Sequence, residues 1–67
     1  MQKWEYLRAH YYQGELRWVN EVETPKPDRK IPPHEWLNRM GEEGWELVMA
    51  YDTLSAGQYY LLKRPKP

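Results

Sequence analysis

The sequence predicts a single α+β domain in which an antiparallel β-sheet packs against one short helix. A chain of 67 residues has room for one hydrophobic core and no second one. Apolar and polar residues alternate with a two-residue period near both ends, and a short segment of helical period lies between them. The period changes from 3.6 to 2 across Gly44, which can adopt the positive φ that closes a helix.

The N-terminal third predicts a β-hairpin. Residues 3–12 and 15–20 are the expected strands, and Gln13-Gly14 is the expected two-residue turn. This turn would pair Tyr12 with Glu15, Tyr11 with Leu16, Ala9 with Trp18 and Leu7 with Asn20. One face of the hairpin would then carry Leu7, Ala9, Tyr11, Leu16 and Trp18, and the other Trp4, Tyr6, Arg8, His10, Tyr12, Arg17 and Val19.

A proline-rich connection and a helix are expected next. Four prolines among charged residues in the segment 21–33 predict a loop, because proline cannot join a sheet ladder or a helix interior. Pro33 is suited to the first helical position. Trp36, Leu37 and Met40 form the apolar stripe of a helix that ends near Gly44, with Gly41 as a second candidate end.

The C-terminal third predicts a second hairpin, with strands over residues 45–52 and 58–64, a turn at 53–57 and a tail at 65–67. A four-residue loop would pair Tyr51 with Tyr60 and Met49 with Leu62. The expected inner face is Trp45, Leu47, Met49, Tyr51, Tyr60 and Leu62, and the expected outer face is Val48, Ala50, Tyr59 and Leu61. We predict a ββαββ domain whose four-stranded sheet has the order 2-1-3-4, with the helix on one face.

One helix covers only one face of such a sheet, so the other face is expected to bind a partner. The chain has no cysteine, which excludes disulfides and thiolate metal sites, and small cores usually need a further source of stability. We therefore expect a homodimer or higher homo-oligomer. The candidate interface or ligand face consists of Trp4, Tyr6, Arg8, His10, Tyr12, Arg17, Val48, Tyr59 and Leu61.

The charge pattern bears on other partners. Ten basic and ten acidic residues cancel, so no net field attracts nucleic acid or an anionic membrane. No apolar run is long enough to cross a membrane and no signal peptide is recognisable, so a cytoplasmic protein is expected. Arg8, His10 and Arg17 interleaved with aromatic residues nevertheless resemble the surfaces that stack nucleotides or single-stranded nucleic acid, and this alternative stays open.

Residues able to perform catalysis are few. His34-Glu35 could form an acid/base pair, but neighbouring helical side chains diverge, so a solvated first turn is the simpler interpretation. Glu42, Glu43 and Glu46 are expected to be solvated turn charges. The sequence has no phosphate-binding loop and no metal-ligand spacing, so we predict no enzyme, catalytic residue, cofactor or metal site.

Three blocks of the sequence resemble a known family. They are Trp4-Glu5-Tyr6, Leu37-Asn38-x-x-Gly41-x-Glu43-Gly44-Trp45-Glu46-Leu47-Val48 and Tyr59-Tyr60-x-x-x-Lys63-Arg64-Pro65, which together span nearly the whole chain. They resemble the small bacterial and phage-associated family catalogued as domain of unknown function 4177, with the middle block the most specific. This chain departs from it in a longer first hairpin and in the proline-rich connection. The resemblance implies a compact α+β domain and no activity, cofactor or catalytic residue.

The sequence thus favours a non-catalytic, homo-oligomeric interaction or assembly module. The alternative is a protein that binds a small ligand, a nucleotide or single-stranded nucleic acid through its aromatic and basic sheet face.

Overall fold

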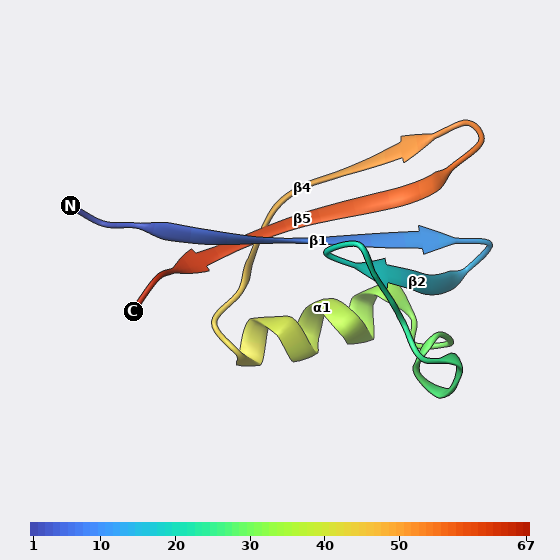
Figure 1. Cartoon of the computed structure of the whole chain (residues 1–67), viewed down its shortest axis with the longest axis horizontal. Helices are drawn as coiled ribbons and strands as arrows, with labels where there is room; N and C mark the ends of the chain where they lie inside the picture. The colour runs from blue at the N-terminus through green and yellow to red at the C-terminus, as the bar shows by residue number, and fades with distance from the viewer.

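The computed structural model describes residues 1–67 and contains one α-helix and one five-stranded antiparallel sheet (Figure 1). The predicted α+β class is confirmed. In chain order the elements are β1 (Trp4–Tyr12), β2 (Glu15–Val19), β3 (Val22–Glu23), the 3-10 helix η1 (Lys26–Asp28), α1 (Pro33–Glu42), β4 (Glu46–Thr53) and β5 (Gly57–Pro65).

The predicted strand order is wrong. The sheet has the order β3-β2-β1-β5-β4, so the C-terminal strand lies in the centre and the strand after the helix lies at the edge. After the helix crosses the sheet, β4 runs parallel to β1, and β5 fills the space between them with antiparallel partners on both sides. Leu62 in β5 is only 1% exposed, and this central position is the one that can bury it.

The helix begins and ends as predicted. Pro33 occupies its first position, where a missing N–H costs no hydrogen bond. At the other end Gly44 has φ of +91°, its N–H donates to the Gly41 carbonyl, and the Trp45 N–H donates to the Met40 carbonyl. This is the Schellman arrangement, in which a residue of positive φ satisfies the last free carbonyls of a helix. It turns the chain directly into β4.

The first hairpin has the predicted turn but contains an unexpected bulge. Gln13 and Gly14 both have positive φ, as a two-residue turn requires, and Tyr12 pairs with Glu15 as predicted. Tyr11 also pairs with Leu16 as predicted. Beyond these pairs the register shifts by one residue, because Arg17 is the extra residue of a bulge. His10 therefore faces Trp18, and Ala9 faces Val19. The prediction that put Trp18 in the core and Val19 outside is wrong, because a shift of one residue exchanges the two faces.

The second hairpin also differs from its predicted register. Thr53 pairs with Gly57, so the loop has three residues and Tyr51 faces Tyr59. Ala50 consequently faces Tyr60 on the helix side, and Met49 and Tyr51 move to the opposite side. A second bulge at Val48 returns Leu47 to its predicted inner face, where it lies opposite Leu62; the prediction that paired Met49 with Leu62 is wrong.

The connection between β2 and α1 is more ordered than predicted. Asn20 and Glu21, both of positive φ, turn the chain so that Val22 pairs with Val19 and β3 forms a fifth strand. Arg29 then ties the connection to the sheet: its carbonyl accepts from the Leu16 N–H, and its guanidinium donates to the Thr24 carbonyl at 2.8 Å.

The core lies between α1 and the inner face of the sheet. Its buried apolar members are Ala9, Tyr11, Leu16, Trp36 and Leu62, with Leu37 and Met40 of α1 packed against them. The Tyr11 hydroxyl donates to the Ile31 carbonyl at 2.7 Å, and burial, followed by the charge of Tyr60, raises the pKa of Tyr11 to about 12.

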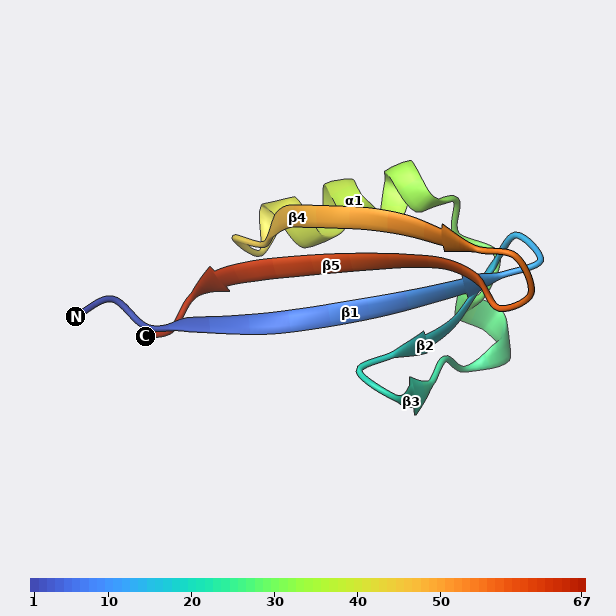
Figure 2. The same ribbon diagram turned by 90° about the horizontal axis from the view of Figure 1, so that it is seen from above.

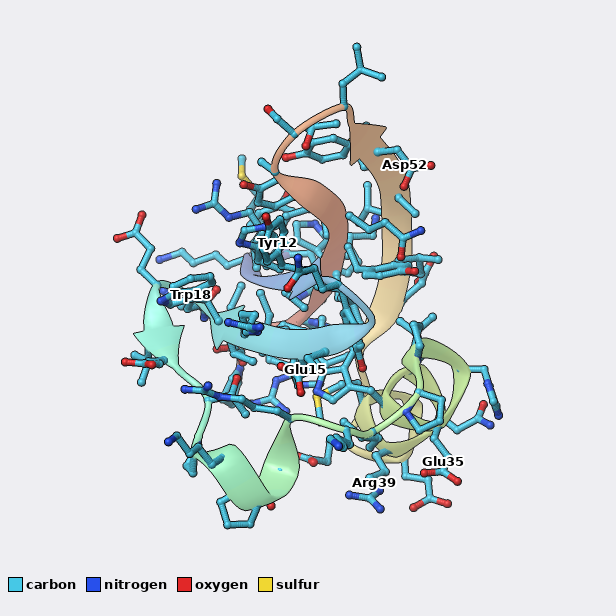
Figure 3. All side chains as sticks on the ribbon, turned by 90° about the vertical axis from the view of Figure 1, so that its right-hand side faces the viewer. Tyr12, Glu15, Trp18, Glu35, Arg39 and Asp52 are labelled. Carbon is cyan, nitrogen blue, oxygen red and sulfur yellow. The ribbon has the colours of Figure 1, made fainter.

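Only one face of the sheet is covered. Figure 2 shows β1, β5 and β4 side by side, and Figure 3, viewed along the strands, shows α1 on one side of the sheet with no element over the other. The uncovered side is called the outer face below.

Candidate functional site

Eight of the nine predicted interface residues belong to the outer face. Strand alternation directs Trp4, Tyr6, Arg8, His10 and Tyr12 of β1 away from the buried positions Ala9 and Tyr11. Tyr59 and Leu61 of β5 lie opposite His10 and Arg8, and the side chain of Arg17 lies over the Tyr12 ring. Val48 is different: it is the extra residue of the β4 bulge and is 47% exposed at the sheet edge.

Four aromatic rings form a continuous row across the sheet, one each from β2, β1, β5 and β4. Trp18 of β2 stacks on His10 of β1, with ring centroids 5.2 Å apart and planes 18° apart. His10 stacks on Tyr59 of β5 at 4.3 Å and 8°, and Tyr59 stacks on Tyr51 of β4 at 5.1 Å and 15°. We call Trp18, His10, Tyr59 and Tyr51 the aromatic row.

The two departures from the predicted register create this row. The bulge at Arg17 turns Trp18 to the outer face, where Figure 3 shows it on the side of β2 away from α1. The three-residue loop before β5 places Tyr51 opposite Tyr59. Sequence reasoning therefore found the two middle rings and missed the two end rings. Trp18 is 38% and Tyr51 40% exposed, whereas the middle rings are half-buried.

Charged groups of both signs surround the aromatic row. The Arg8 guanidinium lies 5.6 Å from the Tyr59 ring centroid and 3.6 Å from a Glu21 carboxylate oxygen. Arg17 pairs with Glu15 at 3.0 Å, where its guanidinium also lies 5.7 Å from the Tyr12 ring. Near the start of β1 and the end of β5, the Lys63 ammonium lies 4.3 Å from the Trp4 ring centroid, a contact that the sequence pattern did not indicate. The basic groups are thus already held against aromatic rings or carboxylates.

A shallow hollow of about 310 Å³ lies beside the row, lined by Arg8, His10, Trp18, Glu21 and Tyr59. Three of these five residues were predicted as site residues, and Trp18 and Glu21 were not. A larger hollow of about 570 Å³ lies between α1 and the connection, where charged residues such as Glu35 and Arg39 line its rim. Figure 3 shows both of these side chains on the outer surface of the helix.

The arrangement of the aromatic row limits its chemistry. Stacked cross-strand rings turn their faces towards each other and their edges towards solvent, so His10 and Tyr59 have both ring faces occupied. His10 Nε2–H also donates to the Ala56 carbonyl in the loop before β5, which fixes the orientation of the imidazole. The row is therefore a preformed, rigid surface.

The remaining candidates from the sequence lie apart from this face. His34 and Glu35 are both exposed in the first turn of α1. Glu42 and Glu43 are exposed at the helix end, and Glu46 pairs across the sheet with Lys63. No group of three or more histidine, cysteine or acidic side chains is arranged to hold a metal ion. The structure also has no helix with the length and apolar character needed to cross a membrane.

Comparison of the chain with models of protein families, with curated proteins and with solved structures finds no match.

Proposed function

We propose that this protein is a non-catalytic interaction module that assembles with further copies of itself through the outer face. The observation that carries the proposal is the aromatic row, together with the exposed rings on the same side of β1. Trp4 is 41% and Tyr6 58% exposed, although such rings gain several kcal/mol in total from leaving water, at about 25 cal/mol per Å². Tryptophan and tyrosine are also the residues most enriched at protein interfaces.

The charges of the outer face favour a second copy as the partner. The face carries three basic and three acidic side chains: Arg8, Arg17 and Lys63, and Glu15, Glu21 and Glu46. Basic groups of one copy can therefore lie against acidic groups of a second copy. The chain has a formal net charge of zero, so long-range repulsion does not oppose assembly.

The area of the face is also suitable. β1 and β5 have nine residues each, β4 eight and β2 five, and at about 3.3 Å per residue and about 4.8 Å per strand they cover roughly 490 Å² of flat surface. Side-chain relief increases the accessible area towards the roughly 800 Å² per partner that stable interfaces bury.

The test is the mass of the assembly measured by sedimentation velocity at micromolar concentrations. We expect the wild-type chain to sediment at twice its 8.2 kDa mass or more. Replacing Tyr59 and Leu61 with glutamate should abolish the outer-face contact and lower the mass of the assembly, while the helical circular dichroism is unchanged. Tyr6→Glu is a milder second variant, because Tyr6 is 58% exposed and contributes little to the fold.

Leu54→Glu is the matched control for these variants. Leu54 is fully exposed in the loop between β4 and β5 and lies outside the face, so this variant should assemble like the wild type. A wild-type chain that remains a monomer at all concentrations would refute the proposal, and so would a Tyr6→Glu variant that assembles normally.

The hollow beside the row supports a second candidate function, the binding of a planar ring such as a nucleobase. Its lining offers one free face of Trp18, with Arg8 and Glu21 as hydrogen-bonding groups. The stacking described above weighs against a long single strand, because the two middle rings have no free face for successive bases.

This second candidate is tested by tryptophan fluorescence during titration with nucleotides and short oligonucleotides. Binding at the hollow should quench Trp18, and Trp18→Leu should abolish the change. An unchanged signal up to millimolar nucleotide would exclude this candidate without affecting the assembly proposal.

A further inference from the structure

The two edges of the sheet differ in a way that bears on assembly. At one edge, β3 has only two residues, and such a short strand offers few free backbone groups. At the other edge, β4 has eight residues, all of them exposed, and its outward backbone groups have no partner strand. Free edges of this length are templates for pairing with another strand.

β4 has some protective features of natural edge strands, namely the acidic side chains of Glu46 and Asp52 and a bulge, but it lacks others. It contains no proline and no lysine or arginine, and Leu47, Val48, Met49 and Tyr51 are 40–48% exposed. Its one irregularity is the bulge at Val48, which leaves a regular segment from Met49 to Thr53.

We propose that β4 pairs antiparallel with β4 of a second copy, with Ala50 opposite the partner's Ala50 at the two-fold axis. An axis perpendicular to the sheet keeps both outer faces on the same side, so each residue must oppose a partner residue of the same face. Centring the pair on Met49 would bring Glu46 towards the partner's Asp52, where two carboxylates repel. Centring it on Ala50 removes this conflict.

The Ala50 register also gives favourable neighbours. On the outer face Met49 lies opposite the partner's Tyr51, and a thioether beside an aromatic ring is a favourable contact. On the inner face two alanines meet at the axis, and their small side chains allow close approach. Asp52 lies near the partner's bulge at Val48, which carries no charge, so no like charges face each other.

Edge pairing explains how a closed dimer can form. Each copy has one long free edge, β4, and an isologous pair joins the β4 edges of the two copies. Only the two-residue β3 strands then remain at the ends of the joined sheet. The two aromatic rows then lie on the same side of one continuous sheet. This pairing uses backbone groups and does not depend on contact between outer faces.

Cysteine cross-linking tests the register directly, because the chain has no native cysteine. Residues directly opposite in antiparallel strands have Cα atoms about 4.5–5.5 Å apart, which is within disulfide range. Under mild oxidation Ala50→Cys should give a cross-linked dimer in high yield. Thr53→Cys is the matched control on the same strand; it would lie near the partner's Leu47, about 20 Å from position 53 of the partner, and should not cross-link.

A charge exchange provides a second measurement. Placed in the Tyr6→Glu background, which removes the outer-face contact, Ala50→Lys and Ala50→Glu put like charges at the axis and should each prevent the remaining dimer, while an equimolar mixture should restore a heterodimer. Ala50 is exposed, so neither change disturbs the core.

Equal cross-linking of the two cysteine variants, or none in either, would overturn the inference, as would unchanged dimerisation of both charged variants. These outcomes are separate from the outer-face test. If Ala50→Cys does not cross-link but Tyr6→Glu still lowers the mass of the assembly, edge pairing alone is refuted. If Ala50→Cys cross-links but Tyr6→Glu does not change the mass of the assembly, the outer-face contact alone is refuted.

Discussion

Replacing Tyr11 with phenylalanine should change how the stability of this protein depends on pH. Tyr11 is 2% exposed, and its hydroxyl donates to the Ile31 carbonyl at 2.7 Å. Burial is the main cause that raises its pKa from 10.0 to about 12, and the charge of Tyr60 is the second. The folded protein therefore holds this proton more firmly than the unfolded chain does. The resulting stabilisation is complete below pH 10 and is lost as the pH rises towards 12.

The size of the effect follows from the shift. Two pKa units correspond to about 2.7 kcal/mol of unfolding free energy, of which about half is lost by pH 11. Tyr11→Phe has no proton to lose but leaves the Ile31 carbonyl without its donor, which costs about 1 kcal/mol at pH 8. The wild type should therefore be more stable at pH 8, and the difference should vanish or reverse near pH 11.

Urea unfolding followed by tryptophan fluorescence between pH 8 and pH 11 measures both chains. The difference between the two curves reports the ionisation of Tyr11, including its charge interaction with Tyr60. A difference that stays constant across this range would show that the Tyr11 hydroxyl ionises as readily in the folded state as in the unfolded one, and would refute the reasoning.

Three further substitutions test what stabilises the fold. A Cβ at Gly57 would lie 2.2 Å from the Tyr11 carbonyl oxygen, and φ there is +89°, so Gly57→Ala should cost at least about 2 kcal/mol in urea unfolding. Gly41→Ala, on an open helix position, should instead stabilise by about 0.5–1 kcal/mol, and similar effects at both glycines would contradict this account. Arg64 lies 4.3 Å from the Trp45 ring and donates to the Glu43 carbonyl at 3.0 Å, so Arg64→Lys should lower the unfolding free energy by about 1 kcal/mol and shift the tryptophan emission. An unchanged emission maximum would argue that the stacked contact is absent in solution.

Local sequence signals predicted the helix and the first turn because their causes lie within a few residues. Pro33 at the helix start, Gly44 at its end and Gln13-Gly14 in the turn each act through their own backbone conformation. The class of the fold and most of the outer face on β1 followed from strand alternation, which is equally local.

The sequence by itself therefore determined the helix, four of the five strands, the fold class and which side of β1 is aromatic. Tertiary structure decided the strand order, which depends on β5 pairing with the distant β1, and the fifth strand, which pairs with β2. It also decided the end rings Trp18 and Tyr51, which depend on a bulge and on one loop length. A bulge or a one-residue change in a loop costs little locally but reverses the direction of every later side chain. Only the packing of the whole sheet against α1 selects among registers that the local sequence leaves nearly equal in energy.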